Sequence, residues 1–184
     1  AKQIVKKFKK DTFRIIEFEP ERLAEIKGIS ERKAREISIQ FHESQDIRQA
    51  MMFLGKYGIN AHLAVKIFNE YGNKMYRVLE ENPYRLADDI QGVGFKIADE
   101  IAEKLGVHTD SDNRICSGVI YVLMQAVSEG HLYLPVELLL ERASALLDVS
   151  RENIRPQMEN MVIDKKLVIR QGQVYAANHY LGST

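Results

Sequence analysis

The sequence contains few of the residues on which most enzyme chemistry depends. Its 184 residues include one cysteine, four prolines and no tryptophan. A single thiol cannot form a disulfide within the chain, and no cysteine and histidine residues have the spacing of a metal site. We therefore predict no metal site. Cys116 falls in an apolar helical pattern and is interpreted as a buried thiol in a reducing compartment.

Motifs for nucleotide and acyl chemistry are also missing. The sequence has no G-x-x-x-x-G-K-[ST] loop and no G-x-S-x-G turn, so we expect it to hydrolyse no nucleotide and to need no cofactor of its own. It shows no signal peptide, and no apolar run approaches the roughly 20 residues of a membrane span. A catalytic role for this chain alone is not predicted.

An excess of charge of either sign is absent as well. The chain has 26 basic and 26 acidic residues, and dividing it at residue 112 leaves both parts balanced. Proteins that bind nucleic acids on their own are usually basic, because phosphate neutralisation provides much of their affinity. Only residues 2–10, with five lysines, are locally basic. Any nucleic-acid contact is expected to be small and local, or to belong to a larger binding machine.

The most informative stretch is residues 86–101. An apolar helical run ends at Ile90, two glycines interrupt it, and a second helical run follows at once. The glycines permit a tight reversal, and the free amide groups at the start of the second helix form a natural seat for a phosphate. The pattern predicts a helix-hairpin-helix motif with phosphate-binding residues Gly92, Val93, Gly94 and Lys96.

The same register occurs twice more, beginning at Gly58 and at Gly28, with spacings of about 30 and 34 residues. Gly94 is replaced by Asn60 in the second unit and by Ser30 in the first. Because Asn tolerates a left-handed backbone and Ser caps helices, both turns are expected to survive. Weaker phosphate sites are therefore predicted at Gly58, Asn60 and Lys66, and at Gly28, Ser30 and Lys33. The basic cluster around Lys33 can also be interpreted as a solvated helix face.

Composition and periodicity predict a mainly α protein in two domains. Helices are expected around residues 31–43, 46–56 and 75–81, and the polar stretch 108–113 is taken as the boundary. Residues 1–112 would then form a tandem helix-hairpin-helix module and residues 113–184 a second domain.

The second domain has a different rhythm. Its expected elements are a helix at 114–129, a short extended piece at 131–135, helices at 136–147 and about 151–164, and strands at 167–170 and 173–177 that turn about residues 171 and 172. This is the order of a winged-helix-like domain ending in a β-hairpin. Its third helix offers Arg151, Arg155 and Gln157 as candidate DNA contacts. Pro156 predicts a kink or a later start for that helix. Winged helices also serve as protein-interaction modules.

One resemblance points to an enzyme. Lys96 follows the hairpin glycines as the attacking lysine does in helix-hairpin-helix DNA glycosylases. Asp110 and Asp112 lie downstream, as the assisting aspartate of that family does, but Asp112, 16 residues on, is short of the usual gap. Those enzymes surround the motif with a base-flipping pocket, whereas the flanking chain here forms further hairpins and the winged helix. The glycosylase/lyase reading is kept as a less favoured alternative.

A longer resemblance covers the whole chain. Residues 82–99, NPYRLADDIQGVGFKIAD, resemble the segment that precedes the motor in long-form RecD/TraA-family bacterial DNA helicases. Shorter segments resemble the same family: residues 53–54, 57–59, 64–67, 71–72 and 130–135, and in the first unit residues 20–23 and 26–29. Ser30 departs from the glycine usual there, which weakens the case for a phosphate contact at the first hairpin.

The resemblance implies that this chain is the N-terminal, non-motor region of a superfamily-1 helicase that moves 5′ to 3′ in DNA repair or recombination. The motor lobes, with ATP and Mg, would follow after about residue 184. The implied partners are DNA at a single-strand/duplex junction, the motor domains of the same polypeptide and a single-strand-binding protein. The implied location is the bacterial cytoplasm, at the nucleoid. The alternative function is a structural or protein-docking module that packs on the motor.

Overall fold

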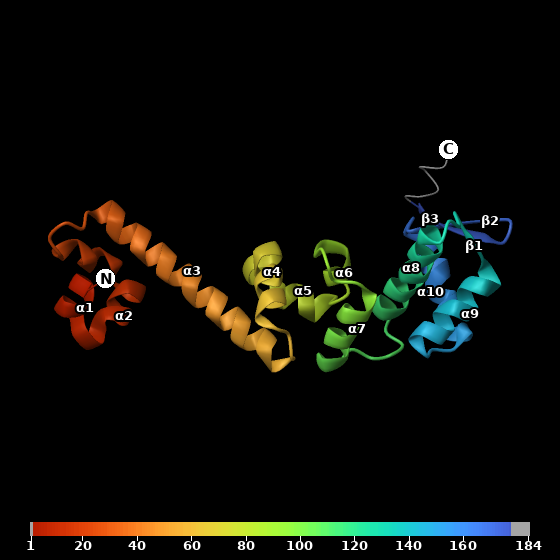
Figure 1. Cartoon of the computed structure of the whole chain (residues 1–184), viewed down its shortest axis with the longest axis horizontal. Helices are drawn as coiled ribbons and strands as arrows, with labels where there is room; N and C mark the ends of the chain where they lie inside the picture. The colour runs from red at the N-terminus through yellow and green to blue at the C-terminus, as the bar shows by residue number, and fades with distance from the viewer. Residues whose placement is uncertain (1, 178–184) are drawn as a thin grey trace. The chain divides into compact units, whose positions relative to one another are not determined.

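The structure is a computed structural model in which residues 2–177 are described (Figure 1). It is predominantly helical, with one small antiparallel sheet formed by residues near the C-terminus. The chain separates into two compact units, and the division lies between Asn73 and Lys74. The prediction of a mainly α protein is confirmed.

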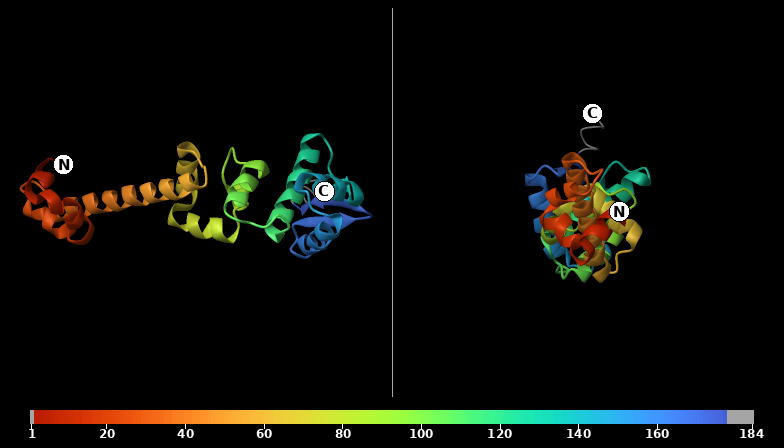
Figure 2. Two further views of the ribbon diagram at one scale, coloured as in Figure 1. Left: turned by 90° about the horizontal axis from the view of Figure 1, so that it is seen from below. Right: turned by 90° about the vertical axis from the view of Figure 1, so that its left-hand side faces the viewer.

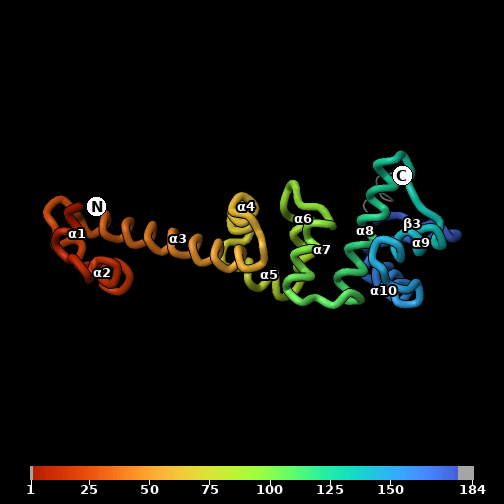
Figure 3. The backbone as a smooth tube through the Cα atoms, turned by 60° about the horizontal axis from the view of Figure 1, so that its bottom comes forward, coloured from red at the N-terminus to blue at the C-terminus, as the bar shows by residue number. Residues whose placement is uncertain are grey.

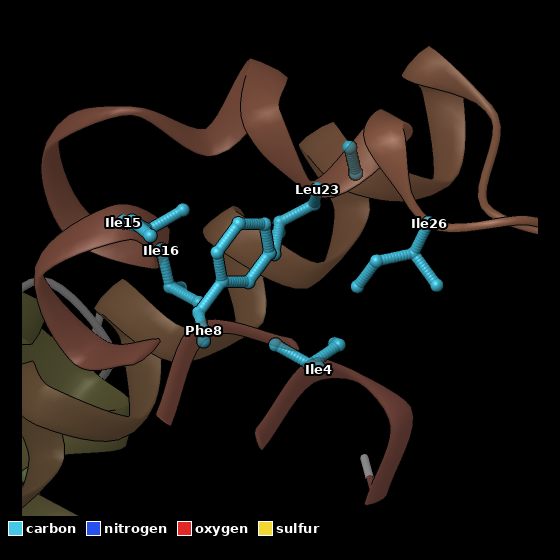
Figure 4. Packing of buried hydrophobic residues seen from close by; sticks show 7 residues of the cluster. Ile4, Phe8, Ile15, Ile16, Leu23 and Ile26 are labelled. Atoms are coloured by element: carbon cyan, nitrogen blue, oxygen red, sulfur yellow. The ribbon is translucent and has the colours of Figure 1, made fainter. Parts of the chain in front are cut away.

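In the first unit, short helices pack against the beginning of one long helix. Its elements are α1 (Lys2–Phe8), η1 (Lys9–Asp11), α2 (Thr12–Phe18), η2 (Pro20–Glu25), α3 (Glu31–Lys56) and α4 (Ala61–Tyr71), followed by η3 (Gly72–Lys74). The core consists of apolar side chains that face one another from these elements. Figure 4 shows Ile4, Phe8, Ile15, Ile16, Leu23 and Ile26. Ala34 of α3 joins this cluster, so the core holds the first hairpin between η2 and α3.

The long helix α3 corrects the prediction of two helices at 31–43 and 46–56. It is continuous over 26 residues from Glu31 to Lys56. Its buried residues lie in two groups at opposite ends: Ala34 and Ser38, then Ala50 and Leu54. The stretch between them is mostly polar, so the apolar periodicity lapses there, and this lapse suggested a break. Because the same stretch contains neither glycine nor proline, the backbone has no reason to leave the helical conformation.

The second unit begins with three short helices. These are α5 (Met75–Glu81), as predicted, then α6 (Arg85–Asp89) and α7 (Phe95–Lys104). The chain reverses between α6 and α7 to form the third hairpin (Figure 3). Leu86 on α6 and Ala98 on α7 are both fully buried, so the two helices of this hairpin are joined by packing as well as by the turn.

The remaining elements follow the order that the sequence predicts (Figure 2). They are α8 (Asp112–Ser128), β1 (Leu134–Pro135), α9 (Val136–Leu147), α10 (Arg151–Ile163), β2 (Leu167–Arg170) and β3 (Gln173–Ala176). The strands form an antiparallel sheet of order β1-β3-β2, in which Val174 pairs with Leu134 on one side and Ile169 on the other. The C-terminal hairpin is therefore the centre and one edge of this sheet.

The predicted hairpin turn in this region agrees with the structure, whereas the predicted start of one helix does not. Gln171 and Gly172 both have positive φ, +53° and +75°, as a two-residue hairpin turn of this type requires. Helix α10, however, begins at Arg151 and runs through Pro156 without the later start that the proline suggested. Pro156 is the sixth residue of the helix, so it removes one backbone hydrogen bond within it, but its side chain is exposed and the helix continues to Ile163.

The expected boundary at residues 108–113 lies inside the second unit. Asp99 of α7 forms an ion pair with Arg114 of α8, with 2.9 Å between Oδ1 and Nε. Phe95 at the start of α7 also packs against Tyr121 of α8, with ring centroids 5.6 Å apart. The third hairpin and the elements that follow it therefore form one compact unit, separate from the first two hairpins.

Candidate nucleic-acid interface

Each of the three hairpins begins with a glycine that no other residue replaces easily. The φ angles are +95° at Gly28, +74° at Gly58 and +91° at Gly92. Residues with a β-carbon rarely adopt such angles, because the β-carbon then lies too close to the carbonyl oxygen. The repeat found in the sequence is therefore a repeat of backbone geometry.

We expect Gly92→Ala to lower the free energy of unfolding by about 1–2 kcal/mol, since alanine is strained at a positive φ. The matched control is Gly94→Ser. Gly94 has φ −98°, and a β-carbon added there meets no atom within 4 Å. Urea denaturation followed by circular dichroism should show a loss only for Gly92→Ala. Equal losses for the two variants would contradict this assignment.

The residue after each of these glycines anchors the turn. The amide of Val93 donates to the Ile90 carbonyl at 3.2 Å, and its side chain is buried. In the second hairpin the amides of Gly58 and Ile59 donate to carbonyls at the end of α3, which closes that helix with a Schellman motif. The amides of Val93 and Gly58, two residues predicted to contact phosphate, therefore already donate to carbonyls within the protein.

The third position of each hairpin is the N-cap of the outgoing helix. Ser30, Asn60 and Gly94 all have extended backbones, so the left-handed tolerance of Asn plays no part at Asn60. Ser30 Oγ accepts from the Lys33 amide at 3.2 Å, and Asn60 Oδ1 accepts from the Leu63 amide at 2.8 Å. The first two hairpins therefore satisfy one of their own free amides.

Gly94 cannot do the same, because it has no side chain, and within residues 2–177 no side chain caps α7 in its place. The amides of residues 95–97 have no acceptor inside the helix. Gly92, Gly94 and Lys96 are exposed, although Val93 between them is buried. Of the three hairpins, the third thus leaves the most open group of amide donors, beside an exposed ammonium group.

The three predicted lysines are not equivalent. Lys96 is the second residue of α7, and Lys33 is the third residue of α3. Lys66 is the sixth residue of α4, about 6 Å further along its helix axis than the second residue would be. The residues in register with Lys96 are Arg32 and His62, both exposed. The repeat register itself was the signal that could have identified them.

The hairpin with the most open amides is not the hairpin with the most basic surroundings. The first hairpin has a small excess of basic side chains, since residues 27–36 contain four basic and two acidic ones: Lys27, Arg32, Lys33 and Arg35, against Glu31 and Glu36. The third hairpin is flanked by acids, namely Asp88, Asp89, Asp99 and Glu100. The first hairpin therefore has the more positive surroundings, whereas the third has the more open amides.

A cluster of polar side chains connects the third hairpin to the helices that follow it. The Tyr84 hydroxyl donates to Asp99 Oδ1 at 2.6 Å, and Arg114 donates to both carboxylate oxygens of Asp99, at 2.9 and 3.2 Å. Arg114 Nη1 also reaches the carbonyls of Thr109 and Leu147, each at 2.7 Å. Burial, followed by the bond to Asp99, raises the pKa of Tyr84, and the bond to Asp99 raises the pKa of Arg114. One guanidinium group therefore joins α7, α8 and the end of α9.

The three candidate contacts on α10 have partners within the protein. Arg155 Nη2 lies 3.0 Å from Glu137 Oε1, and Arg151 Nη1 lies 4.0 Å from Oε2 of the same carboxylate. Gln157 donates to Asp112 Oδ1 at 2.7 Å. The arginines remain half exposed, whereas Gln157 links α10 to α8. The carboxamide of Gln157, a candidate DNA contact, is therefore already hydrogen-bonded within the protein.

The glycosylase alternative gains no support from the geometry. Asp112 accepts the hydrogen bond from Gln157 at the start of α8, and Asp110 is exposed in the preceding turn.

Among the described residues, no three metal-ligating side chains gather into a site. No helix in that part of the chain has both the length and the apolar character that a membrane span requires.

Cys116 is half-buried on α8, not fully buried as interpreted from the sequence. Burial raises the pKa of its thiol; nearby Lys166 partly opposes this shift, and Asp112 and Asp164 reinforce it. Because the thiolate is the reactive form, we expect alkylation of Cys116 to reach its half-maximal rate at a higher pH than alkylation of a small free thiol. Iodoacetamide rates between pH 7 and 10 measure this, and the urea-unfolded chain is the control. A midpoint equal to that of the unfolded chain would contradict the shift.

Comparison with known proteins finds a family model that matches the middle of the chain. Residues 43–133 match the model of the "ATP-dependent RecD2 DNA helicase HHH domain". The match includes the second and third hairpins and ends before the C-terminal sheet; the first hairpin lies outside it. A curated ATP-dependent RecD2 DNA helicase of Deinococcus radiodurans is 24% identical over 136 residues, which are 73% of this chain and 19% of the relative. The chain thus spans about a fifth of the length of that relative.

Proposed function

Because residues 43–133 belong to the helix-hairpin-helix domain family of RecD2 helicases, we propose that this chain binds and positions DNA through its phosphate backbone. It is an accessory region, and the strand is held without its sequence being read. Backbone phosphates are the same for every sequence, so contacts to them fix the position of a protein but not its choice of site.

The observation that carries the proposal is the open N-terminus of α7. The amides of residues 95–97, which have no acceptor within the helix, lie at the positive end of the helix dipole, and the exposed Lys96 belongs to the same first turn. This combination favours an anion with several oxygen acceptors. Ser30 with Lys33 provides a secondary contact, since one amide of that helix is already capped. Asn60 with Lys66 provides a weaker one, because its helix is also capped and Lys66 lies further from the free amides.

Few contacts and no excess of basic residues predict weak binding. The dissociation constant for duplex or forked DNA should be on the order of 10⁻⁴–10⁻⁶ M, in the range of non-specific binding. Affinity should fall steeply as the salt concentration rises, because each phosphate contact releases counterions. The C-terminal elements, in the order of a winged helix, add contacts through Arg151 and Arg155 only where DNA displaces Glu137 from them.

The parent protein in this proposal is a RecD-like helicase that moves 5′ to 3′ on single strands in DNA repair or recombination. Its motor domains, which bind ATP and Mg, belong to a part of the polypeptide outside this chain. In the bacterial cytoplasm, at the nucleoid, the accessory region holds duplex near the fork while the motor moves the strand. A single-strand-binding protein is the partner expected at the same junction.

The test exchanges the caps of two hairpins. Gly94→Ser gives α7 the cap that Ser30 provides for α3, so its side chain competes with phosphate for the same amide. We expect Gly94→Ser to weaken binding of forked DNA several-fold without loss of stability, and Ser30→Gly, which opens the first hairpin, to leave binding unchanged or stronger. Fluorescence anisotropy at 50 mM salt measures both variants. Unchanged affinity in Gly94→Ser would remove the third hairpin from the proposal.

A second candidate is a protein-docking module that packs on the motor or recruits a single-strand-binding protein. The net charge of zero and the acidic flanks of the third hairpin favour it. Anisotropy with forked DNA at low and moderate salt separates the two functions. Binding at low salt that weakens at moderate salt supports DNA positioning, whereas no binding at either salt supports docking.

A further inference from the structure

Three aromatic rings form a ladder directly behind the third hairpin. The rings of Tyr84 and Phe95 stack with centroids 5.8 Å apart and an interplanar angle of 16°, and Phe95 is 5.6 Å from Tyr121 at 31°. Tyr84 and Phe95 are buried, whereas Tyr121 is only half-buried. Its hydroxyl accepts from Gln125 at 2.7 Å, which fixes the ring. The ladder therefore ends in a fixed, partly exposed aromatic ring.

That last ring lines a pocket of about 540 Å³ between the third hairpin, α8 and the C-terminal elements. This volume lies within the range of small-molecule sites, and it exceeds what one planar heterocycle requires. Gly94 lies on the wall of the same pocket, and so does Met124 of α8. The pocket thus joins an aromatic surface to the hairpin whose amides are open.

Two carboxamides provide the polar part of the lining. Asn82 Oδ1 accepts from the Tyr84 amide at 3.1 Å, and Asn113 Nδ2 donates to the Glu81 carbonyl at 3.1 Å. Each bond fixes one end of its carboxamide. Within residues 2–177 the other ends, the Asn82 amino group and the Asn113 oxygen, have no protein partner. Both carboxamides line the pocket beside the aromatic ladder, so the Asn82 amino group is its candidate donor and the Asn113 oxygen its candidate acceptor.

We propose that this pocket receives an unpaired nucleobase of the DNA strand whose phosphate is held at Gly94. The base continues the aromatic ladder by stacking on Tyr121, and its hydrogen-bonding edge meets the carboxamides of Asn82 and Asn113. Lys166 and Asp88 also line the pocket, and their opposite charges offset each other, so the pocket carries no net charge from these two residues. The inference rests on the proposed DNA contact. It adds that the chain should bind single strands and fork junctions more tightly than blunt duplex.

The chemistry favours a base over other small ligands. Every base has a π face, so stacking on tyrosine is tolerant of sequence, in keeping with backbone binding next to it. A base in a duplex is already stacked and paired, and its edge cannot reach the carboxamides without unpairing. A base that is already unpaired enters without that cost.

The single cysteine makes the pocket directly observable. Cys116 lines it and is the chain's one thiol. We expect a forked oligonucleotide, at a concentration that anisotropy shows to be saturating, to slow the labelling of Cys116 by a maleimide about ten-fold. A blunt duplex of the same length, at equal occupancy, should slow it by less than two-fold. The wild-type chain is used throughout, so no variant has to fold.

A pair of variants tests the aromatic ring itself. Tyr121→Leu keeps apolar bulk but removes the stacking face, whereas Tyr121→Phe keeps the face and loses only the hydroxyl. Base stacking on an aromatic side chain contributes roughly five-fold or more to affinity. Tyr121→Leu should therefore lose the preference for forked DNA over duplex, and Tyr121→Phe should keep it.

The outcomes separate the two ideas. Binding of forked DNA with no protection of Cys116, or a preference that survives in Tyr121→Leu, overturns the base pocket and leaves the backbone contact standing. Failure of the wild-type chain to bind forked and duplex DNA overturns the proposed function, and the base pocket with it. Protection by the fork alone, together with lost preference in Tyr121→Leu, supports the pocket.

Discussion

Arg114→Leu should lower the free energy of unfolding by about 3 kcal/mol, the largest effect on stability that we expect from a single substitution here. The side chain of Arg114 is only 12% exposed, and that of its partner Asp99 is 27% exposed. Removing the guanidinium leaves the carboxylate largely buried without its counter-charge. It also leaves the carbonyls of Thr109 and Leu147 without their donor. Urea denaturation of the full chain, followed by circular dichroism, measures the loss.

The matched control is Arg77→Leu, which removes an arginine with the same kind of partner. Arg77 pairs with Glu81 at 2.8 Å on the surface of α5, and its side chain is 79% exposed. Solvent screens such pairs, so we expect no measurable change in the unfolding midpoint. If both variants lost the same stability, Arg114 would be an ordinary surface residue and could not hold the third hairpin against α8 and α9.

Lys96→Glu should weaken binding of forked DNA at least ten-fold at low salt and reduce the salt dependence of log Kd by about one unit or more. The substitution removes the ammonium beside the open amides and places a carboxylate where a phosphate would lie. A glutamate in the first turn of a helix suits the helix dipole, so the fold should keep its stability. Anisotropy titrations at several salt concentrations measure both quantities.

Lys66→Glu provides the control for this prediction, because it makes the same change of charge on α4. Lys66 lies nearly two turns into its helix, away from the free amides, and Asn60 already caps that helix. We expect its effect on affinity to be about three-fold or less. Equal losses in the two variants would show that only net charge matters and that the third hairpin has no special role.

The hairpins were predictable because their constraints are local. A glycine at positive φ, followed by an apolar anchor and a helical run, is written into adjacent residues, and the three positive φ angles confirm the register. The caps could be interpreted only in part. The turns at Ser30 and Asn60 were predicted correctly. That the side chains of Ser30 and Asn60 each accept from one amide could not be predicted, because it depends on the extended backbone at these positions. Gly94 has the same extended backbone but no side chain, so it leaves that amide open.

Other features depend on contacts between distant residues, and the sequence alone did not reveal them. In the sequence, Arg114 is one polar residue in a helical pattern. Only the fold shows that it donates to Asp99, Thr109 and Leu147. Gln157 was predicted to contact DNA because the sequence does not show its hydrogen-bond partner, Asp112, which is 45 residues away. The polar stretch at 108–113 indicated a boundary, although packing joins the segments on either side of it.

The most direct measurement of the central claim is an amide chemical-shift titration of the isotopically labelled chain with forked DNA. At low salt the amides of Phe95, Lys96 and Ile97 should shift in proportion to occupancy and return as salt is added. The amides of Lys33 and Leu63, which already donate to Ser30 and Asn60, should shift much less. Shifts confined to other surfaces, with residues 95–97 unmoved, would contradict the account.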